Sequence, residues 1–325
     1  MCRRRRRRRR RQRQVLTTMS SFTMENTYQS CLADLTTTNS SSSPTAEALL
    51  QCISNSFDAS RTNTNDAVDA FFLLFASTLV FFMQTGFAMV CAGSVRLENV
   101  QNTLLKNLLD ACAVSFGFYS VGYAFAYGTS SSSSSTTTFI GNSNFFLMNV
   151  DDDDYAFWFF QFAFCATSGT IVAGALAERC QITAYLAYSL FLSSFVYPVV
   201  VHAIWSNNGF LSTQNVNPLW DSGMIDFAGS CVVHITGGAT ALIASKVLGP
   251  RTGRFHDIHG NMLENPKEMP GHSLALQCLG VSSYSRHCVL VCFVSVVLRF
   301  TRIPFYSSFS LYMLWLIMIQ RFFRR

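Results

Sequence analysis

Charged residues are scarce in this sequence. They make up 13% of its 325 residues, whereas a soluble domain carries about 25%. Hydrophobic residues account for 50%, phenylalanine alone occurs 30 times, and the mean hydropathy is +0.26. These values exclude a disordered protein, a collagen and an ordinary cytosolic enzyme. They favour a protein that crosses the lipid bilayer several times.

Sequence motifs of catalysis and metal binding are also missing. The eleven cysteines include no CxxC pair, so a zinc site and a thioredoxin-like redox site have no support. A GxxxxGKS/T phosphate loop, an HExxH zinc motif and a nucleophile elbow are all absent. We therefore expect no enzyme activity, no cofactor and no metal site.

The positive charge is concentrated near the start of the chain. Arg3 to Arg11 and Arg13 supply ten of the 24 basic residues, which leaves 14 basic against 18 acidic residues elsewhere. Such a run is typical of a solvated tail that contacts nucleic acid or anionic lipid; the alternative is a translation start placed too far upstream. No apolar segment follows the run, so it is not a signal peptide. We expect no nucleic-acid partner.

Long apolar stretches dominate the middle of the chain. Each approaches or exceeds the ~20 residues that cross a ~30 Å hydrocarbon core. The five stretches are residues 67–92, 107–128, 155–177, 182–205 and 227–245, and their only acidic or basic residues are Asp69 and Asp110. Shorter apolar runs at 288–298 and 303–319 could add one or two helices. The sequence therefore predicts an all-α polytopic membrane protein with five to six transmembrane helices.

Basic residues alternate between the connections. The connections 93–106, 178–181 and 246–267 contain Lys or Arg, whereas 206–225 contains neither and 129–154 ends in four aspartates. Because basic connections stay in the cytoplasm, the first, third and fifth connections are predicted there and the amino terminus outside. The polar arm before the first stretch, with its glycosylation sequon at Asn39, is then extracellular.

Asp226, directly before the fifth stretch, and His234, within it, are candidate polar residues. They are eight residues apart, which places the imidazole ~12 Å deeper than the carboxylate and close to the bilayer midplane. An ionisable group at that depth indicates an ion or proton pathway, and the alternative is a histidine hydrogen-bonded between helices. For Asp226 the alternatives are a helix N-cap and a functional carboxylate, which are compatible.

Three aromatic residues are candidates as well. Phe160 and Phe164 are four residues apart and share one helix face, which either meets lipid or forms a hydrophobic constriction. Trp205 ends the fourth stretch on the outer side, as an interfacial anchor or as a ring that attracts a cation.

Four strings carry a family resemblance: QTGFAMVCAGSVRLENVQNTLLKNLLDA (84–111), TIVAGALAER (170–179), FVYPVVVHAIW (195–205) and DFAGSCVVHITGG (226–238). They resemble the ammonium transporter family, specifically its eukaryotic type 1 group, from about Asp66 to about Gly280. The resemblance implies the first half of an eleven-helix fold with an inverted repeat, and a pore in each subunit of a homotrimer.

The same resemblance assigns roles to individual residues. Trp205, Asp226 and Phe160 match residues of the outer recruitment site, Phe164 matches a gate phenylalanine, and His234 matches the first of two pore histidines. Cys31 and Cys52 resemble the paired extracellular cysteines of the type 1 group, which implies a disulfide.

The chain departs from the family after GHSLALQCLG (271–280), which resembles the start of the sixth helix. We therefore expect a chain truncated relative to the family. Its predicted parts are an extracellular arm with an arginine-rich start (1–66), a transporter-like transmembrane region (67–280) and a divergent apolar and basic tail (281–325).

The function that the resemblance implies is ammonium transport across a membrane, expected to be the plasma membrane, through a hydrophobic pore. Ammonium would lose its proton at the gate, because a bare charge in an apolar pore costs several kcal/mol. The alternative is a non-transporting truncated relative that acts as an ammonium sensor or as a partner subunit.

Overall fold

The structure is a computed structural model. It describes residues 26–33, 35, 45–128, 137–151, 154–257 and 259–299, with side chains as far as Cys288. Four sequence features lie outside the described residues: the arginine run, the sequon at Asn39, the serine tract 130–135 and the apolar run 303–319. The chain divides into two compact units, Met1–Phe71 and Phe72–Arg325.

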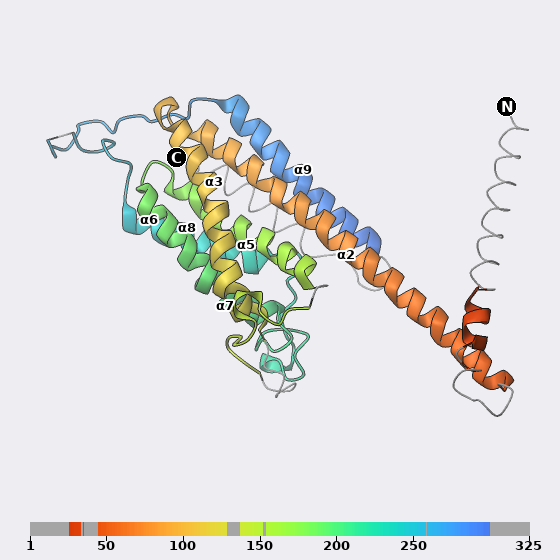
Figure 1. Ribbon diagram of the computed structural model, residues 1–325. Helices are drawn as coiled ribbons and strands as arrows, with labels where there is room; N and C mark the ends of the chain where they lie inside the picture. The colour runs from red at the N-terminus through yellow and green to blue at the C-terminus, as the bar shows by residue number, and fades with distance from the viewer. Residues whose placement is uncertain are drawn as a thin grey trace, which may run out of the picture. The chain divides into compact units, whose positions relative to one another are not determined.

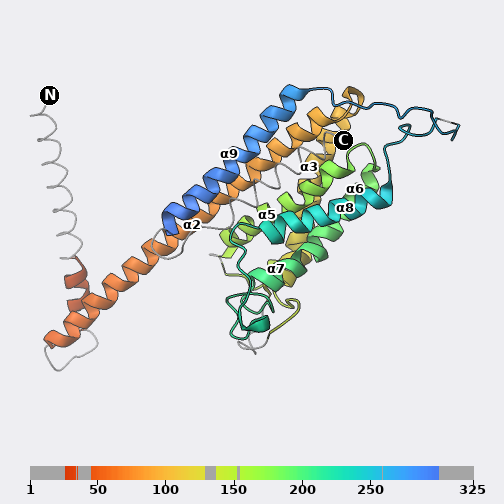
Figure 2. The same cartoon turned by 180° about the vertical axis from the view of Figure 1, so that it is seen from behind.

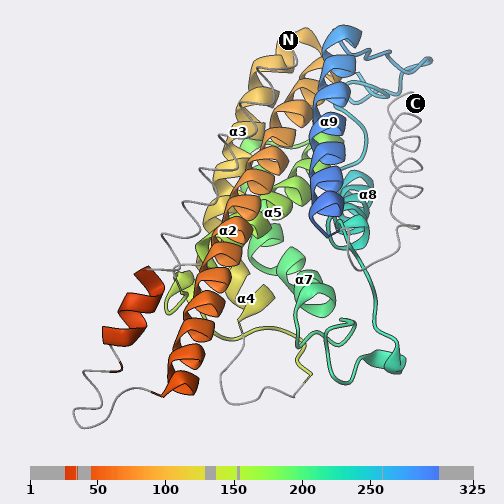
Figure 3. The same ribbon diagram turned by 90° about the vertical axis from the view of Figure 1, so that its right-hand side faces the viewer.

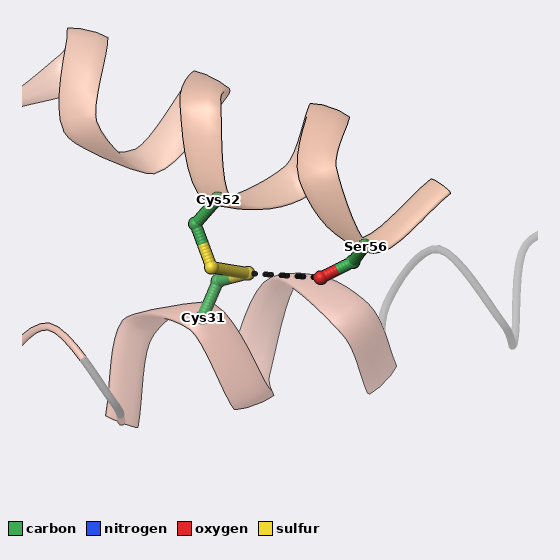
Figure 4. The surroundings of a disulfide bond; sticks show 3 residues. All are labelled: Cys31, Cys52 and Ser56. Atoms are coloured by element: carbon green, nitrogen blue, oxygen red, sulfur yellow. Dashed lines mark hydrogen bonds between the residues drawn. A yellow bond between two sulfur atoms is a disulfide. The ribbon is translucent and has the colours of Figure 1, made fainter. Parts of the chain in front are cut away.

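A disulfide joins two helical segments of the first unit. Residues 26–33 are helical, and α2 (Ala46–Ser94) begins in this unit. The Cα atoms of Cys31 and Cys52 are 5.9 Å apart and their sulfurs are bonded, while Ser56 Oγ lies 3.7 Å from Cys31 Sγ (Figure 4). The bond ties residues 26–33 to the first turns of α2, which restricts the chain that separates them.

The helix α2 begins 21 residues before the apolar stretch predicted at residue 67. No glycine or proline lies between Ala46 and Gly86, so nothing in the polar part interrupts the helix. Hydropathy predicts which part of a helix can lie in a membrane. It does not predict where the helix begins, because a polar segment without glycine or proline can continue the same helix.

The second unit continues from Phe72 and consists of helices and their connections; isolated bridges, but no β-strand, occur in the part of the chain that the structure describes. Its elements after α2 are η1 (Leu97–Asn99), α3 (Val100–Gly117), η2 (Phe118–Gly122), α4 (Tyr123–Tyr127), η3 (Phe145–Leu147), α5 (Asp154–Leu176), α6 (Ile182–Phe191), η4 (Leu192–Val196), α7 (Tyr197–Trp205), η5 (Leu219–Asp221), η6 (Ser230–Ile235), α8 (Thr236–Leu248) and α9 (Leu274–Arg299).

Five helical stretches among the described residues are long and apolar enough to cross a membrane. They are Ala46–Ser94, Leu97–Tyr127, Asp154–Leu176, Ile182–Trp205 and Ser230–Leu248. The predicted all-α class with five membrane spans is therefore confirmed. The helix α9 also contains the shorter apolar run 288–298.

Two of the spans contain a π-helical turn in mid-course. The turn η2 separates α3 from α4, η4 separates α6 from α7, and the two turns contact each other. Pro198, in the first turn of α7, has no N–H to donate, which accounts for an irregular helix just before it. The fully buried rings of Phe118 and Tyr197 meet edge to face beside the turns, with centroids 6.4 Å apart.

The helix α5 is central to this unit and contacts both α3 and α8 (Figure 3). On another side, α9 lies along α2 in both opposed views (Figures 1 and 2). Glycines permit the close approach of α9 to α2, because a Cβ on Gly86 would lie 2.7 Å from the Tyr284 nitrogen and one on Gly280 would lie 2.6 Å from the Gly86 oxygen. The rings of Phe87 and Tyr284 stack at 4.9 Å across the same contact.

Three connections meet at one end of the unit around Glu178. Its Oε1 accepts hydrogen bonds from Arg96 N and Nε at 3.0 and 3.1 Å and from Asn99 Nδ2 at 2.7 Å, and its Oε2 lies 2.7 Å from Arg251 Nη1. The side chain of Glu178 is 1% exposed. Burial would raise its pKa, but the hydrogen bonds from Asn99 and Arg96 and the charge of Arg251 together hold the pKa below its ordinary value.

We predict that the Glu178→Gln variant has a lower melting temperature than the parent chain at neutral pH. A carboxyl whose pKa is lower in the folded state stabilises the fold above its unfolded pKa, and the contribution is lost as pH falls through the folded pKa. The difference between parent and variant should therefore shrink as the pH falls below the ordinary range of a glutamate.

Melting curves of the detergent-purified chain over a pH series measure this difference. The matched control is Glu98→Gln, which changes an exposed carboxyl of the same first connection. A difference between the Glu178 variant and the parent that stays constant down to low pH would contradict the prediction.

Candidate functional site

The three aromatic candidates are in contact. Phe160 and Phe164 lie one turn apart on α5 with ring centroids 4.9 Å apart, and Phe164 and Trp205 meet at 5.8 Å; both pairs are edge to face. Phe164 is partly buried and packs against both larger hydrophobic clusters of the second unit. Two of the rings therefore come from α5, while Trp205 is the last residue of α7.

A hydrogen bond links this row of rings to Asp226. The indole N–H of Trp205 donates to the main-chain oxygen of Asp226 at 2.7 Å, across 21 residues of sequence. The hydrogen bond fixes the orientation of the indole. Gly229 lies beside the same ring with a φ of +80°, and a Cβ there would come within 2.6 Å of Val233 Cγ2.

The carboxylate of Asp226 caps the start of η6. Oδ1 accepts from the main-chain nitrogens of Gly229 and Ser230 at 2.9 Å each and from the Ser230 hydroxyl at 3.2 Å. Oδ2 accepts from the nitrogens of Cys231 and Val232 at 2.9 and 2.8 Å. The first nitrogens of a helix have no partner within it, so this buried carboxylate supplies what they lack. Asp226 lies three residues before Gly229, which is the N-cap residue of η6, so its carboxylate caps the helix from outside the N-cap position.

His234 lies in the π-helical turn that Asp226 starts. Its Nδ1 is 2.9 Å from the carbonyl oxygen of Gly229, which also accepts the main-chain N–H of His234 at 3.0 Å. A carbonyl only accepts, so Nδ1 carries a hydrogen and the ring is held against its own helix. The imidazole is partly buried. This hydrogen bond fixes the orientation of the ring relative to its own turn.

These contacts lead from Phe160 through Phe164 and Trp205 to Asp226, and Gly229 links Asp226 to His234. The aromatic rings provide apolar surface with faces of negative potential, and the histidine provides a ring that can donate and accept hydrogen bonds. In the part of the chain that the structure describes, no three His, Cys, Asp or Glu side chains gather as metal ligands.

One buried histidine escaped the sequence analysis. His202 is 0% exposed; its Nδ1 lies 2.8 Å from the Ala126 oxygen, and its Nε2 lies 2.8 Å from the Thr138 hydroxyl. It joins α7 to the end of α4 and to the connection that follows, three residues before Trp205. Its position within an apolar span was a signal of the same kind as that of His234.

The sequence profile of the Ammonium Transporter Family matches residues 70–283. The chain is 47% identical over 226 residues to ammonium transporter 1 member 3 of Solanum lycopersicum, covering 70% of this chain and 46% of that protein. It is 41% identical over 219 residues to putative ammonium transporter 1 of Caenorhabditis elegans, covering 67% and 40%.

Solved structures agree. One named Sensor Amt Protein superposes with a TM-score of 0.59 at 30% identity, covering 70% of this chain and 56% of that chain. Candida albicans Mep2 superposes with a TM-score of 0.53 at 25% identity, covering 67% and 46%.

The helices and their apolar lengths define a multi-pass membrane protein. The chain belongs to the ammonium transporter family. It spans about half the length of the curated relatives that it matches.

We predict that Asp226→Ala lowers the stability of the folded chain by ~1–2 kcal/mol, because the first amides of η6 lose their acceptor. Asp226→Asn should lose less, since one of its two terminal atoms still accepts. Melting temperatures of the purified variants measure the effect. The control is Asp221→Asn, an exposed residue of the same connection at a positive φ that Asn also adopts. Equal melting temperatures for Asp226→Ala and the parent would show that the cap is dispensable.

Proposed function

We propose that this chain provides one side of a pore for ammonium, in which Trp205, Phe160 and Asp226 form the recruitment site, Phe164 the gate and His234 the pore lining. The observation that carries the proposal is the row of contacts from the aromatic rings to Asp226 and from there through Gly229 to His234. Membership of the ammonium transporter family and the names of the curated relatives supply the substrate.

The first step of the proposed mechanism is attraction of the cation. An ammonium ion approaches the half-buried face of Trp205, whose indole is held by the Asp226 main chain. Asp226 contributes by fixing the start of η6 and thereby the positions of Trp205 and His234, since both of its carboxylate oxygens are engaged by the helix.

The second step is loss of the charge. Phe160 and Phe164 offer apolar surface beyond the tryptophan, and a cation that leaves water there gains no replacement for its hydration shell. Neutral ammonia passes the rings at much lower cost than the cation, so ammonium gives its proton to water on the outer side of the gate. His234 then lies deeper on η6, where its imidazole can accept a hydrogen bond from ammonia or donate one to it.

The setting of this pore is the plasma membrane, in a homotrimer when the complete set of helices is present, with the amino terminus outside. Two observations support the orientation. The connections around Glu178, which carry Arg96 and Arg251, lie at one end of the second unit, as the positive-inside rule requires for cytoplasmic loops. The Cys31–Cys52 disulfide suits an oxidising, extracellular environment for the first unit.

We predict that an epitope at the amino terminus is labelled by antibody on intact cells, whereas the same epitope inserted after Gly260, in the α8–α9 connection, is labelled only after permeabilisation. Gly260 is exposed and has a φ of +83°, so the insertion falls in a turn rather than a helix. Labelling of the Gly260 epitope on intact cells would reverse the proposed orientation.

Transport is tested in cells that lack ammonium uptake. Because the chain spans about half of its relatives, it is expressed alone and together with the part of the tomato relative beyond the matched region. We predict uptake in the paired form, and a loss of about tenfold or more, worth ~1.4 kcal/mol in the barrier, when His234 is changed to Ala. Uptake is normalised to surface protein, so that a folding defect is not counted as a transport defect.

The matched control is His259→Ala, an exposed histidine of the α8–α9 connection. It should leave uptake unchanged. Parental uptake by the His234→Ala pair would remove His234 from the pore. A chain that transports in neither form but lowers the uptake of a co-expressed complete relative would instead be the partner subunit that the sequence also allows.

A further inference from the structure

A buried polar cluster lies where α2, α3, α5 and α6 meet, away from the row of contacts described above. Asp110 of α3 is 1% exposed, and Thr170 of α5 and Ser189 of α6 are also buried. The Ser189 hydroxyl donates to Asp110 Oδ1, Thr170 Oγ1 lies 3.5 Å from Asp110 Oδ2, and Thr170 also bonds Gln84 Oε1 of α2. Four helices are therefore joined by oxygen-to-oxygen contacts around one carboxyl.

The hydrogens of this cluster do not suffice if Asp110 is ionised. The Thr170 hydroxyl has one hydrogen, yet three acceptors surround it: Gln84 Oε1, Asp110 Oδ2 and the Ala166 carbonyl oxygen at 2.8 Å. If Asp110 Oδ2 carried a hydrogen, it would donate that hydrogen to Thr170 Oγ1. The two oxygens would then form a hydrogen bond, whereas without this hydrogen they repel each other. The neighbouring contacts then remain as they are.

Rotating the Gln84 amide by 180° is a poorer way to supply the missing hydrogen. Its Nε2 donates to Thr167 Oγ1 at 3.3 Å, and the Thr167 hydroxyl donates to the Ala163 oxygen at 2.9 Å. In the rotated amide, Nε2 would donate to Thr170 Oγ1, but the Thr167 hydroxyl would have to leave the Ala163 oxygen to donate to Oε1, so the number of hydrogen bonds would not rise. The described orientation of Gln84 therefore leaves Asp110 as the group that supplies the missing hydrogen.

No basic side chain contacts the carboxyl in the part of the chain that the structure describes. The titratable groups facing Asp110 are Cys91 of α2, Cys165 of α5, and Tyr185 and Tyr188 of α6. Lys106 lies one turn before Asp110 on the same helix. The Nζ atom of Lys106 donates to the Cys180 oxygen at 2.6 Å and lies 5.8 Å from the centre of the Tyr185 ring. An ionised Asp110 would be a charge in the membrane with hydroxyls alone for partners, which is costly.

We propose that Asp110 carries a proton and is a positioning residue: as a neutral acid it accepts from Ser189, donates to Thr170 and so fixes α5 against α3 and α6. Asp226 is the opposite case, since both of its oxygens face N–H or hydroxyl donors and it acts as a carboxylate.

The position of α5 matters for the proposed gate. Phe164 lies on the same helix, six residues before Thr170. Beside Thr170, a Cβ on Gly169 would lie 3.3 Å from Asp110 Oδ2, and on another side of α5 a Cβ on Gly237 of α8 would lie 3.0 Å from the Ser168 oxygen. A shift of α5 would therefore be transmitted to Phe164 and to the helix that continues from His234.

The protonation is tested on the purified 325-residue chain by infrared spectroscopy with isotope-labelled aspartate. A protonated aspartate has a carbonyl stretch that is separate from the amide and carboxylate bands. We expect this band in the parent chain, its loss in Asp110→Asn and its retention in Asp226→Asn. A parent chain without the band, or a band that persists in Asp110→Asn, would overturn the proposal.

The positioning role is tested with variants that separate hydrogen bonding from charge. Asp110→Asn reproduces the neutral acid, with an oxygen that accepts from Ser189 and an N–H that donates to Thr170, whereas Asp110→Leu keeps a similar volume without either bond. We expect the melting temperature of the Asn variant to match that of the parent and that of the Leu variant to fall. If the Leu variant cannot be purified, Thr170→Val, which removes one hydroxyl and keeps the shape, should give a smaller fall. An Asn variant as unstable as the Leu variant, or a Leu variant or Thr170→Val as stable as the parent, would overturn the role.

The uptake assay adds a readout that rests on the proposed function. In the paired expression, Asp110→Asn should transport like the parent. In Asp110→Leu or Thr170→Val, uptake per surface protein should be about tenfold lower than in the parent. Loss in Asp110→Asn equal to that in Asp110→Leu would overturn the proposal. If the parent pair itself does not transport, the proposed function fails, while the infrared band and the melting temperatures still decide the state and role of Asp110.

Discussion

The carboxylate of Asp226 holds the chain at the point where the long α7–α8 connection becomes a helix. Four main-chain amides and one hydroxyl converge on its two oxygens, and the main-chain oxygen of the same residue receives the indole N–H of Trp205. One residue therefore determines where η6 begins, how Trp205 is oriented and, through the first turn, where His234 lies. The aromatic rings of α5 depend on this arrangement too, because Phe164 packs on the ring that Asp226 fixes.

In the proposed pore, this dependence lets a negatively charged residue lie beside the path of the cation without binding the cation. In a medium of low polarity the first amides of a helix need an acceptor, and water is a poor source of one there. A carboxylate that serves the helix leaves the aromatic faces and the main-chain dipoles to meet the substrate. Its negative charge still lowers the energy of a cation at short range, so structural and electrostatic roles coincide in one side chain.

The sequence was sufficient for the spans and for local contacts. The apolar stretches predicted at 155–177 and 182–205 agree within one residue with Asp154–Leu176 and Ile182–Trp205, because hydrophobic length is a property of the segment itself. The contact of Phe160 with Phe164 likewise follows from a spacing of four on a helix. The cap at Asp226 is also local, since all five of its donors lie within six residues.

Apart from the Cys31–Cys52 disulfide, which the family resemblance implied, contacts between distant segments could not be predicted. Trp205 meets Asp226 across 21 residues and Asp110 meets Ser189 across 79, and neither pair has a pattern in the sequence that marks it. Asp110 was visible only as the single charge of its span, with nothing to say which hydroxyls surround it. The π-helical turns were also missed, because their cause is packing between two spans, and Pro198 marks only one of them.

The arrangement around Glu178 has a consequence for how the protein is made. Arg96 and Asn99 precede Glu178 in the chain, so they are already synthesised when it emerges, whereas Arg251 follows only after α8. The partners of Oε1 are therefore present when the third span enters the membrane, whereas the partner of Oε2, Arg251, is synthesised only after the fifth span. Glu178 joins an early stage of membrane insertion to a late one, and its ion pair with Arg251 closes only when the five spans have been assembled in order.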